Sequence, residues 1–371
     1  MTGPRYTPLI TSLPSTVPFV GPEVQERALG RPFAARLGAN ENVFGPSPKA
    51  IKAMQEAVPE TWMYGDSASH DLRSALAAHH NVTIDNIVIG AGIDGLLGSL
   101  VRMTVAAGDK VVTSAGAYPT FNYHVNGFGG ELVQLPFKND MEDPDALIAK
   151  ATEVDAKLLY LANPDNPMGT WHSADVITDM INRLPDGCLM VLDEAYVEFA
   201  PKGTAPPMQP DNPNVIHMRT FSKAYGMAGA RVGAAIGHVD LIANFAKVRD
   251  HFGMSRVSQA GALAALQDQT YLSETLAKVD AARMRISNIA HANSLAPLPS
   301  ATNFVTIDCG KSGDFARAIV AEMTTLGVFI RMPFVAPQDR CIRISAGTPA
   351  DLDLLETALP KALTAARIKC P

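Results

Sequence analysis

The chain has 371 residues, of which 47% are hydrophobic and 18% charged, so it can bury a large core and we expect two domains. Its formal net charge is −6 at pH 7 without a block of like charges, which argues against a nucleic-acid-binding surface and a polybasic membrane contact. The four cysteines lack CxxC spacing, and no apolar stretch has the length of a signal peptide or a membrane span. We therefore expect a cytoplasmic protein without a metal site or a disulfide framework.

The first forty residues are rich in proline and short of helical periodicity, which predicts an extended arm that lies on another part of the protein or on a partner subunit. From about Pro48 onward, helical patterns at 51–58 and 72–80 begin an alternation of helices with short apolar strands. The expected strands cover residues 86–90, 110–115, 130–137, 157–163, 188–195, 214–220 and 232–237. Continuous apolar runs are typical of strands covered on both faces. The pattern thus predicts an α/β domain with a mainly parallel sheet and a site at the carboxyl ends of its strands.

A long helical region at 258–293 leads away from this sheet, and a second, smaller α/β unit follows. That unit is expected to contain strands at 303–309, 328–332 and 341–345 and helices at 315–327 and 352–368. The predicted division is an N-terminal arm with part of the small domain at 1–45, a large domain at 46–265 and a small C-terminal domain at 266–371.

Residues 90–95 read GAGIDG, which fits the pattern G-x-G-x-x-G between a strand and a helix. A dinucleotide site would need an acidic residue at the end of the next strand, which instead ends in Ser114 and Ala115. The loop can still cradle a single phosphate, because backbone N–H groups at a helix N-terminus favour an anion. The residues expected to meet that phosphate are Ala91, Gly92, Ile93 and Asp94. A tight turn without a ligand is the alternative.

Residues 220–231, TFSKAYGMAGAR, are dense in small side chains that would let a planar ligand approach the backbone. Thr220, Ser222 and Arg231 supply hydroxyl and guanidinium donors suited to a phosphate dianion. Lys223, crowded by Arg231 and partly desolvated, is expected to have a depressed pKa and so to act as a nucleophile toward an aldehyde. A surface lysine at a helix start is the alternative.

The segment T-F-S-K-A-Y-G-x-A-G resembles the pyridoxal-phosphate (PLP) attachment signature of class II aminotransferases. In chain order, RLGANENVFGPSP, YGDSASHDLRSALA, NPDNPMG, VLDEAYVEF and IRISAGTPADLDLLETAL look like histidinol-phosphate aminotransferases and their close relatives. The resemblance implies the PLP-dependent transferase fold type I. That fold has a mainly parallel seven-stranded sheet in the large domain, a small α/β C-terminal domain and a homodimer with shared active sites.

The resemblance also implies roles for single residues. Lys223 would hold pyridoxal 5'-phosphate as a Schiff base. Asp193, at the end of an apolar strand, would keep the pyridine nitrogen protonated, although a helix N-cap is the commoner use of such a residue. Asn166 and Tyr196 would hydrogen-bond the phenolic oxygen of the ring. Glu194 matches the family pattern as well and is assigned a structural role.

Two further aromatic roles follow from the resemblance. Phe121 sits where the family places an aromatic side chain stacked on the pyridoxal ring, with Tyr118 as a weaker candidate. Tyr64 resembles the tyrosine that reaches across a dimer interface to the phosphate of the neighbouring subunit's cofactor. Taken alone, Phe121 would be a core residue and Tyr64 a surface aromatic.

Substrate binding is expected on the small domain. Arg343 alternates with Ile342 and Ile344 on a strand, so its guanidinium lies on the opposite face from these two side chains, and it matches the arginine that binds the substrate's α-carboxylate. A plain ion pair is the alternative. Arg331 is expected to hold a distal anionic group, and Phe19 stands where relatives tend to place a tyrosine hydroxyl near the substrate.

The implied activity is transamination between a small-molecule amino donor and a 2-oxo acid, with histidinol phosphate and 2-oxoglutarate as the leading pair. An aromatic amino acid aminotransferase is the runner-up, favoured if Phe19 makes the pocket apolar. A PLP-dependent decarboxylase such as threonine-phosphate decarboxylase shares nearly all of these motifs. An NAD-dependent oxidoreductase would lack its ribose-binding acid, and a PLP-binding regulator would lack room for a DNA-binding domain before the arm.

Overall fold

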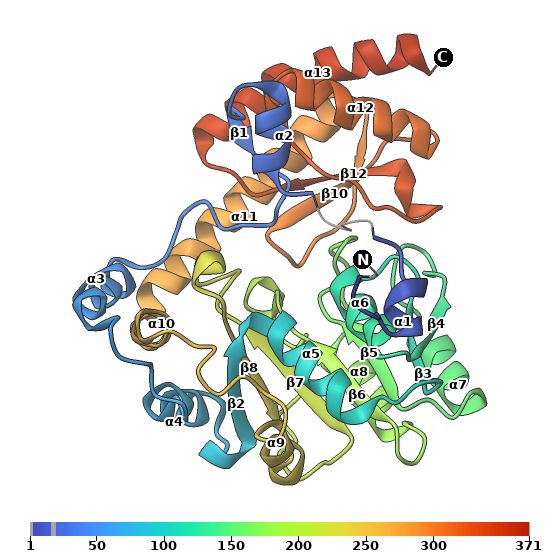
Figure 1. Ribbon diagram of the computed structural model, residues 1–371. Coiled ribbons are helices and arrows are strands. Elements are labelled where there is room, and N and C mark those ends of the chain that lie inside the picture. The colour runs from blue at the N-terminus through green and yellow to red at the C-terminus, as the bar shows by residue number, and fades with distance from the viewer. Residues whose placement is uncertain (1–2, 16–19, 371) are drawn as a thin grey trace.

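The computed structural model describes residues 3–15 and 20–370, so Phe19, expected near the substrate, lies outside the described residues. Two bodies are visible in Figure 1: a lower one around a large sheet and an upper one that carries the C-terminus. The helix α11 (Gln269–Ala292) runs from the lower body into the upper one.

The large sheet has seven strands in the order β2-β8-β7-β6-β5-β3-β4. Its strands are β2 (Ile87–Ala91), β3 (Lys110–Ser114), β4 (Glu131–Leu135), β5 (Leu158–Ala162), β6 (Leu189–Asp193), β7 (Val215–Thr220) and β8 (Val232–Gly237). All neighbouring pairs are parallel except those that β8 makes with β2 and β7, which are antiparallel. The predicted fold class, with a mainly parallel seven-stranded sheet, is confirmed.

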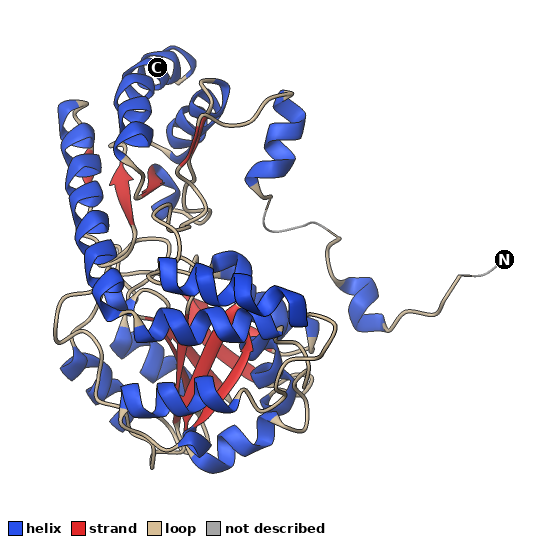
Figure 2. Cartoon of the chain, turned by 90° about the vertical axis from the view of Figure 1, so that its left-hand side faces the viewer, coloured by secondary structure: helices blue, strands red, loops and turns tan. Residues whose placement is uncertain are grey.

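Helices cover both faces of this sheet (Figure 2). They are α4 (His70–His80), α5 (Gly92–Thr104), α6 (Pro119–Gly127), α7 (Pro144–Glu153), α8 (Ala174–Asn182), α9 (Val239–Phe245) and α10 (Arg256–Gln267). The helix α3 (Pro48–Ala57) stands apart from the sheet and packs against α10. Successive strand residues point to opposite faces. Leu158 and Tyr160 therefore pack in the core that includes α5 and α6, whereas Leu159 and Leu161 pack in the core that includes α7 and α8. Burial on both faces accounts for the continuous apolar runs of the strands.

The upper body contains a three-stranded antiparallel sheet in the order β12-β10-β9. Its elements are β9 (Ala296–Pro297), β10 (Phe304–Asp308), α12 (Gly313–Thr325), β12 (Cys341–Ser345) and α13 (Pro349–Lys369). The strand expected at 328–332 is shorter, β11 (Val328–Phe329), and it pairs in parallel with β1 (Ala35–Arg36) instead of joining this sheet. Short 3-10 helices lie between the other elements, at Val58–Glu60, Ile84–Asn86, Val197–Phe199, Ala228–Ala230 and Gln338–Arg340.

The prediction that the first forty residues lack helix is wrong. They contain α1 (Pro8–Ser12) and α2 (Pro22–Leu29), and α2 ends at Gly30, whose φ of 69° closes the last turn. The carboxylate of Glu26 then accepts hydrogen bonds from Phe33 N at 2.9 Å and from Arg36. Tertiary contacts of this kind stabilise a helix of only eight residues.

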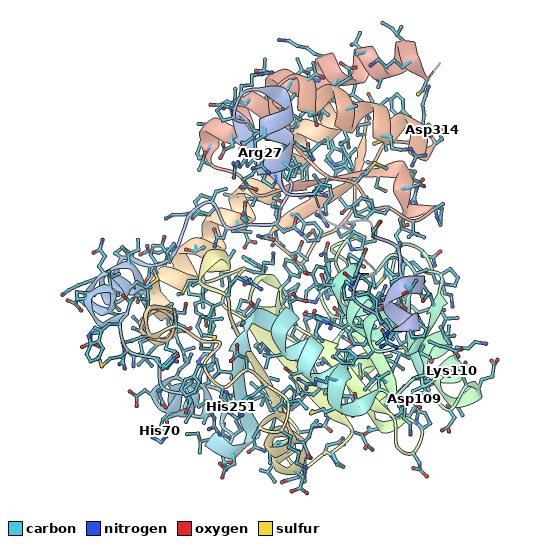
Figure 3. The ribbon with its side chains drawn as sticks, in the orientation of Figure 1. Arg27, His70, Asp109, Lys110, His251 and Asp314 are labelled. Atoms are coloured by element: carbon cyan, nitrogen blue, oxygen red, sulfur yellow. The ribbon has the colours of Figure 1, made fainter. Side chains whose placement is uncertain are left out.

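The side chains show where α2 lies. Arg27 of α2 and Asp314 of α12 are on the upper body, whereas His70 and Lys110 are on the lower one (Figure 3). Part of the N-terminal segment therefore packs with the small unit.

The expected long helix at 258–293 is two helices, α10 and α11, that meet at Asp268. The carboxylate of Asp268 binds Lys49 Nζ at 3.1 Å, which ties the junction to α3. The division at residues 45 and 265 stays a proposal, and α10 ends at Gln267, close to the second boundary.

An ion pair joins the two bodies at the rim of the large sheet. Asp140, between β4 and α7, accepts hydrogen bonds from Arg340 Nη2 at 2.6 Å and from Gln338 Nε2 at 3.1 Å. Arg340 also binds Asp308 at 2.7 Å. These contacts hold the small body over the carboxyl ends of the parallel strands. Within residues 3–15 and 20–370, none of the helices combines the length and the apolar character that crossing a bilayer requires.

Candidate active site

A cavity of about 360 Å³ lies between the carboxyl ends of the large sheet and the small body. The expected site residues that line it are Ile93, Asp94, Asn166, Asp193, Tyr196, Thr220, Ser222, Lys223, Arg231, Arg331 and Arg343. A second cavity, of about 440 Å³, lies between α4, β2 and α9 and is lined by none of the expected site residues. These residues therefore converge on one place, although they are spread over the chain from Ile93 to Arg343, whereas the expected site residues Ala91, Gly92, Phe121 and Tyr64 do not line the cavity.

Lys223 lies in this cavity, where Nζ donates a hydrogen bond to Asn40 O at 3.0 Å and sits 5.5 Å from the ring centre of Tyr196. Burial, and then the positive charge of Arg343, lower the pKa of Lys223 to about 8. Arg231 contributes less than Arg343, so the expected crowding by Arg231 is only part of the cause. A large share of this amine is neutral near pH 8 and can act as a nucleophile or a base.

Asp193 ends β6 with its side chain turned toward the cavity and only 5% of the residue exposed. Its Oδ2 accepts a hydrogen bond from Tyr160 OH at 2.7 Å, and Oδ1 accepts one from Ala195 N at 3.0 Å. Burial raises the pKa of this carboxyl. No α-helix starts at Asp193, so the helix N-cap alternative does not apply. A cationic partner in the cavity would offset the cost of burying the carboxylate.

An anion cradle forms where α5 begins. Gly92 opens this helix with φ of 75°, and a side chain there would stand 2.3 Å from Arg231 Nη2. The backbone of Gly233 packs directly against that of Gly92, since an added Cβ on Gly233 would lie 2.6 Å from Gly92 C. Arg231 Nη1 donates to Ser222 Oγ at 3.3 Å. The helix start, one guanidinium and one hydroxyl therefore meet at a single spot, which suits a phosphate group.

The side chains of Thr220 and Asp94, which were also expected to contact the phosphate, interact with other groups of the protein. Thr220 Oγ1 accepts a hydrogen bond from Ser222 N at 3.0 Å and donates one to Val232 O at 3.3 Å, so it braces the turn that carries Ser222. The carboxylate of Asp94 lies 2.9 Å from His124 Nε2. The side chain of Asp94 is thus occupied by His124, which leaves its backbone for the expected contact with an anion.

Arg343 connects the small body to the loop that carries Asn166. Its Nη1 donates to Asn166 Oδ1 at 2.5 Å, and its Nη2 donates to Gly38 O at 3.2 Å. Burial lowers the pKa of Arg343. Arg331 forms an isolated bridge with Arg343, stacks at 5.2 Å on Phe329 and donates to Val20 O. Burial, then the charge of Arg343, lower the pKa of Arg331 to about 10.

The assignment of Phe121 to ring stacking is not supported. Phe121 is fully buried and stacks on Tyr160, with ring centres 4.5 Å apart, inside the core between the sheet and α6. Tyr118, the weaker candidate, lines the cavity instead. Position 121 is the third residue of α6 and faces the sheet, whereas Tyr118 precedes the helix and faces the strand ends.

Tyr64 is 76% exposed and packs against Phe252 with ring centres 4.7 Å apart and the ring planes tilted by 38°, outside the cavity of its own chain. Its contact with a neighbouring subunit stays a prediction.

Sequence reasoning missed Asn40. This residue is 2% exposed, has φ of 54°, and donates from Nδ2 to Tyr196 OH at 3.1 Å while its carbonyl oxygen accepts from Lys223. Its Oδ1 also accepts from Ser345 Oγ at 3.0 Å. The available signal was its place in the quoted stretch RLGANENVFGPSP, where an asparagine tolerates the left-handed conformation.

The chain matches known proteins over almost its full length. Residues 35–359 match the family model described as aminotransferase class I and II. Histidinol-phosphate aminotransferase from Anaeromyxobacter sp. is 34% identical over 98% of this chain and 100% of its own length, and the enzyme from Staphylococcus epidermidis is 33% identical over 92% and 95%.

Among solved structures, histidinol-phosphate aminotransferase from Sinorhizobium meliloti in complex with pyridoxal-5'-phosphate is 53% identical. It covers 98% of each chain with a TM-score of 0.95. Aspartate aminotransferase from Rhizobium meliloti is 19% identical with a TM-score of 0.81, which shows the shared fold. The chain therefore belongs to the aminotransferases of class I and II.

Proposed function

We propose that this protein is a PLP-dependent aminotransferase that acts on histidinol phosphate with 2-oxoglutarate as the amino acceptor. The observation that carries the proposal is the convergence of a lysine of depressed pKa, an anion cradle and a buried carboxylate on one cavity. This donor set fits pyridoxal 5'-phosphate, which has an aldehyde, a phosphate and a basic ring nitrogen. The relative that is 53% identical has that cofactor in its crystal structure.

Different residues would bind different parts of the cofactor. Arg231, Ser222 and the start of α5 would bind its phosphate, and Asp193 would bind the ring nitrogen. Asn166 and Tyr196 would hydrogen-bond the phenolic oxygen. Tyr118 is the aromatic side chain that lines the cavity and could cover the ring face.

When bound, PLP supplies an acceptor for the electrons released at the substrate's α-carbon. Lys223 Nζ is partly neutral near pH 8, so it would take the proton from the substrate's α-carbon and pass it to a carbon of the cofactor. Arg343 would orient the substrate by binding its anionic end, and Asn40 O would hold Nζ in place between turnovers. Tyr160 would keep the Asp193 carboxylate directed at the cavity.

Two guanidinium groups favour an anionic substrate. Arg331 and Arg343 both line the cavity, and each has a pKa lowered by burial, so neither is strongly solvated. A phosphate-bearing amine that exchanges with a dicarboxylic 2-oxo acid would use these cations in both half-reactions. The names of the curated relatives support the same substrate.

The test is an amino-donor panel with purified protein and added PLP. We expect glutamate to form from 2-oxoglutarate with histidinol phosphate at a higher kcat/KM than with phenylalanine or tyrosine. A preference for the aromatic donors would instead establish the runner-up activity, and release of carbon dioxide would establish a decarboxylase. A protein with no visible band after PLP addition would refute the cofactor assignment.

The rate of PLP binding should depend on pH. The neutral form of Lys223 is the nucleophile, so recombination of apoprotein with PLP should accelerate as the pH rises and level off above about 8, where this amine is mostly deprotonated. Stopped-flow absorbance measures this rate. A profile that keeps rising to the ordinary pKa of lysine would contradict the burial of Nζ.

Gly92→Ala should weaken cofactor binding. The new Cβ would require Arg231 to move and would be strained at a φ of 75°. The expected loss is on the order of 10-fold to 100-fold in PLP affinity, the equivalent of one hydrogen bond to a charged group. Titration of the apoprotein with PLP measures it, and Gly203→Ala, at a positive φ with open space around it, is the matched control.

The cytoplasm stays the predicted location of the protein.

We also propose that the protein is a homodimer. Three large side chains, those of Trp62, Tyr64 and Phe252, are 81%, 76% and 55% exposed, which is an unusual set for the surface of a monomer. Analytical ultracentrifugation should give a dimer mass for the purified protein. Trp62→Glu should shift that mass toward the monomer, whereas Ile368→Glu, at an exposed position on α13, should not.

A further inference from the structure

A buried charged cluster lies beside the active site, on the other face of the large sheet. Glu194 is 1% exposed, and its Oε2 accepts hydrogen bonds from His217 Nδ1 at 3.0 Å and Arg219 Nε at 2.9 Å. Arg219 Nη1 also lies 3.9 Å from Glu198 Oε1. We refer to Glu194, Glu198, His217 and Arg219 as the buried cluster, in which Glu194 and His217 are fully buried and Glu198 and Arg219 partly buried. None of its side chains lines the cavity, and none has a part in the proposed chemistry.

The cluster is a costly arrangement for folding. Within the described part of the chain, Glu194 Oε1, Glu198 Oε2 and His217 Nε2 are buried without a hydrogen-bond partner. Buried charges and unpaired polar atoms destabilise a folded protein more than apolar side chains of the same size would. Stability alone therefore does not account for these ionisable side chains, and a requirement for one exact backbone position would.

The cluster joins the two chain segments that build the cofactor site. Glu194 stands directly after Asp193 and two residues before Tyr196. His217 and Arg219 lie on β7, immediately before the segment that carries Thr220 and Lys223.

The neighbouring strands β6 and β7 are parallel and aligned, with Asp193 opposite Met218, and Glu194 N donates to Met218 O at 3.0 Å. A side-chain tie across this pair would fix how far the carboxylate of Asp193 lies from the amine of Lys223.

The charge state of Glu194 fits such a tie. Burial raises the pKa of this carboxyl, but the charges of Arg219 and His217 outweigh burial and hold the pKa below its ordinary value. The groups that face the cluster from α4 are His79 and His80, and burial lowers the pKa of both. An ionised Glu194 between two donors gives a shorter and more rigid link than a neutral group.

We propose that Glu194 is a positioning residue: through His217 and Arg219 it locks the end of β6 to the end of β7, and so sets the geometry between Asp193 and Lys223. The inference rests on the proposed PLP chemistry, because that geometry matters only if both groups act on one cofactor. Glu194 touches neither substrate nor cofactor, and its effect passes through the backbone of its two neighbours in sequence.

The first test compares Glu194→Gln with Glu26→Gln in PLP-loaded protein. Glu26 likewise accepts a hydrogen bond from an arginine, Arg36, together with one from a backbone amide, and it lies outside the cavity. We expect Glu194→Gln to lower kcat by about 10-fold to 100-fold, because small displacements of catalytic groups have effects of this size, with little change in KM for the amino donor. It should also shift the pH midpoint of the bound cofactor's visible band. Glu26→Gln should change neither quantity, although it lowers Tm.

The second test uses His217, in case Glu194→Gln folds poorly. An asparagine amide can replace Nδ1 as a donor to Glu194, whereas leucine cannot. His217→Asn should therefore retain the kcat and the pH midpoint of the wild type, and His217→Leu should change both in the direction of Glu194→Gln. If Glu194→Gln and His217→Leu lower Tm and leave kcat and the pH midpoint unchanged, the cluster is structural only and the inference is wrong.

The outcomes separate this inference from the proposed function. A wild-type protein without a visible PLP band refutes the function itself. A wild-type protein with the band, together with variants that match it in kcat and pH midpoint, refutes only the positioning role of Glu194.

Discussion

Lys223→Ala is expected to abolish transamination, with a loss of about 10⁴-fold or more in kcat/KM, because one side chain would serve as both the covalent attachment point and the proton carrier. The neighbours of Nζ are a backbone carbonyl and an aromatic ring, so within the described chain no second amine stands ready to replace it. The fold should persist, because truncation removes a single hydrogen bond to Asn40 O.

The experiment reads activity, absorbance and the site of attachment. Borohydride reduction of the PLP-loaded wild type, followed by peptide mass spectrometry, should place the label on Lys223, and Lys223→Ala should carry none. Lys247→Ala is the matched control, since this lysine is exposed and outside the cavity. A label on another lysine, or turnover close to wild type in Lys223→Ala, would contradict the assignment.

The order of elements could be predicted because buried strands leave a strong signal. The strands expected at 157–163 and 188–195 contain continuous apolar runs, at 158–162 and 188–192, and the structure has β5 and β6 at those places. The ends of these strands are also where Asn166 and Asp193 were expected, and both line the cavity. In an open α/β sheet, ligands bind outside the carboxyl ends of the strands, so a residue that directly follows a predicted strand is expected near the site.

The errors arose where tertiary contacts decide the structure. The helix α2 has only eight residues, and it depends on contacts with Arg36 and the small body, which a sequence pattern within the helix does not reveal. Asn40 has a functional neighbourhood only because residues 183 and 156 positions further along fold onto it. Tyr118 lies just before α6 and lines the cavity, whereas Phe121 lies within the helix and does not line it. The sequence does not reveal this difference, because it depends on the direction in which the helix starts.

The charges of the cavity explain why a single fold suits an anionic substrate and a cationic ring together. Three guanidinium groups, those of Arg231, Arg331 and Arg343, line the cavity. The buried carboxylate of Asp193 lies at the strand ends among them. A phosphate and a carboxylate would therefore meet positive charge, and a protonated ring nitrogen would meet the carboxylate of Asp193.

Asp193→Asn is expected to lower kcat by about 10²-fold to 10³-fold, the range seen when a preorganised electrostatic partner of a reacting group is removed. The amide has the same shape as the carboxylate, and Oδ1 can still accept from Ala195 N. Tm should stay unchanged or rise, because the variant no longer buries a charge at a site where burial raises the pKa. A fall in kcat without a fall in Tm would separate an electrostatic role from a structural one.

Tyr160→Phe is the matched comparison, since it removes the hydrogen bond to Asp193 Oδ2 and keeps the charge. Its expected effect on kcat is about 10-fold to 100-fold, as for the loss of one hydrogen bond to a charged group. Steady-state kinetics at saturating donor, together with the visible spectrum of bound PLP, measure both variants. If Asp193→Asn kept wild-type kcat while Tyr160→Phe lost activity, the carboxylate would serve only to hold Tyr160. The ring nitrogen would then need another partner among the residues that line the cavity. Within the described chain, Asp94 is the other carboxylate that lines it.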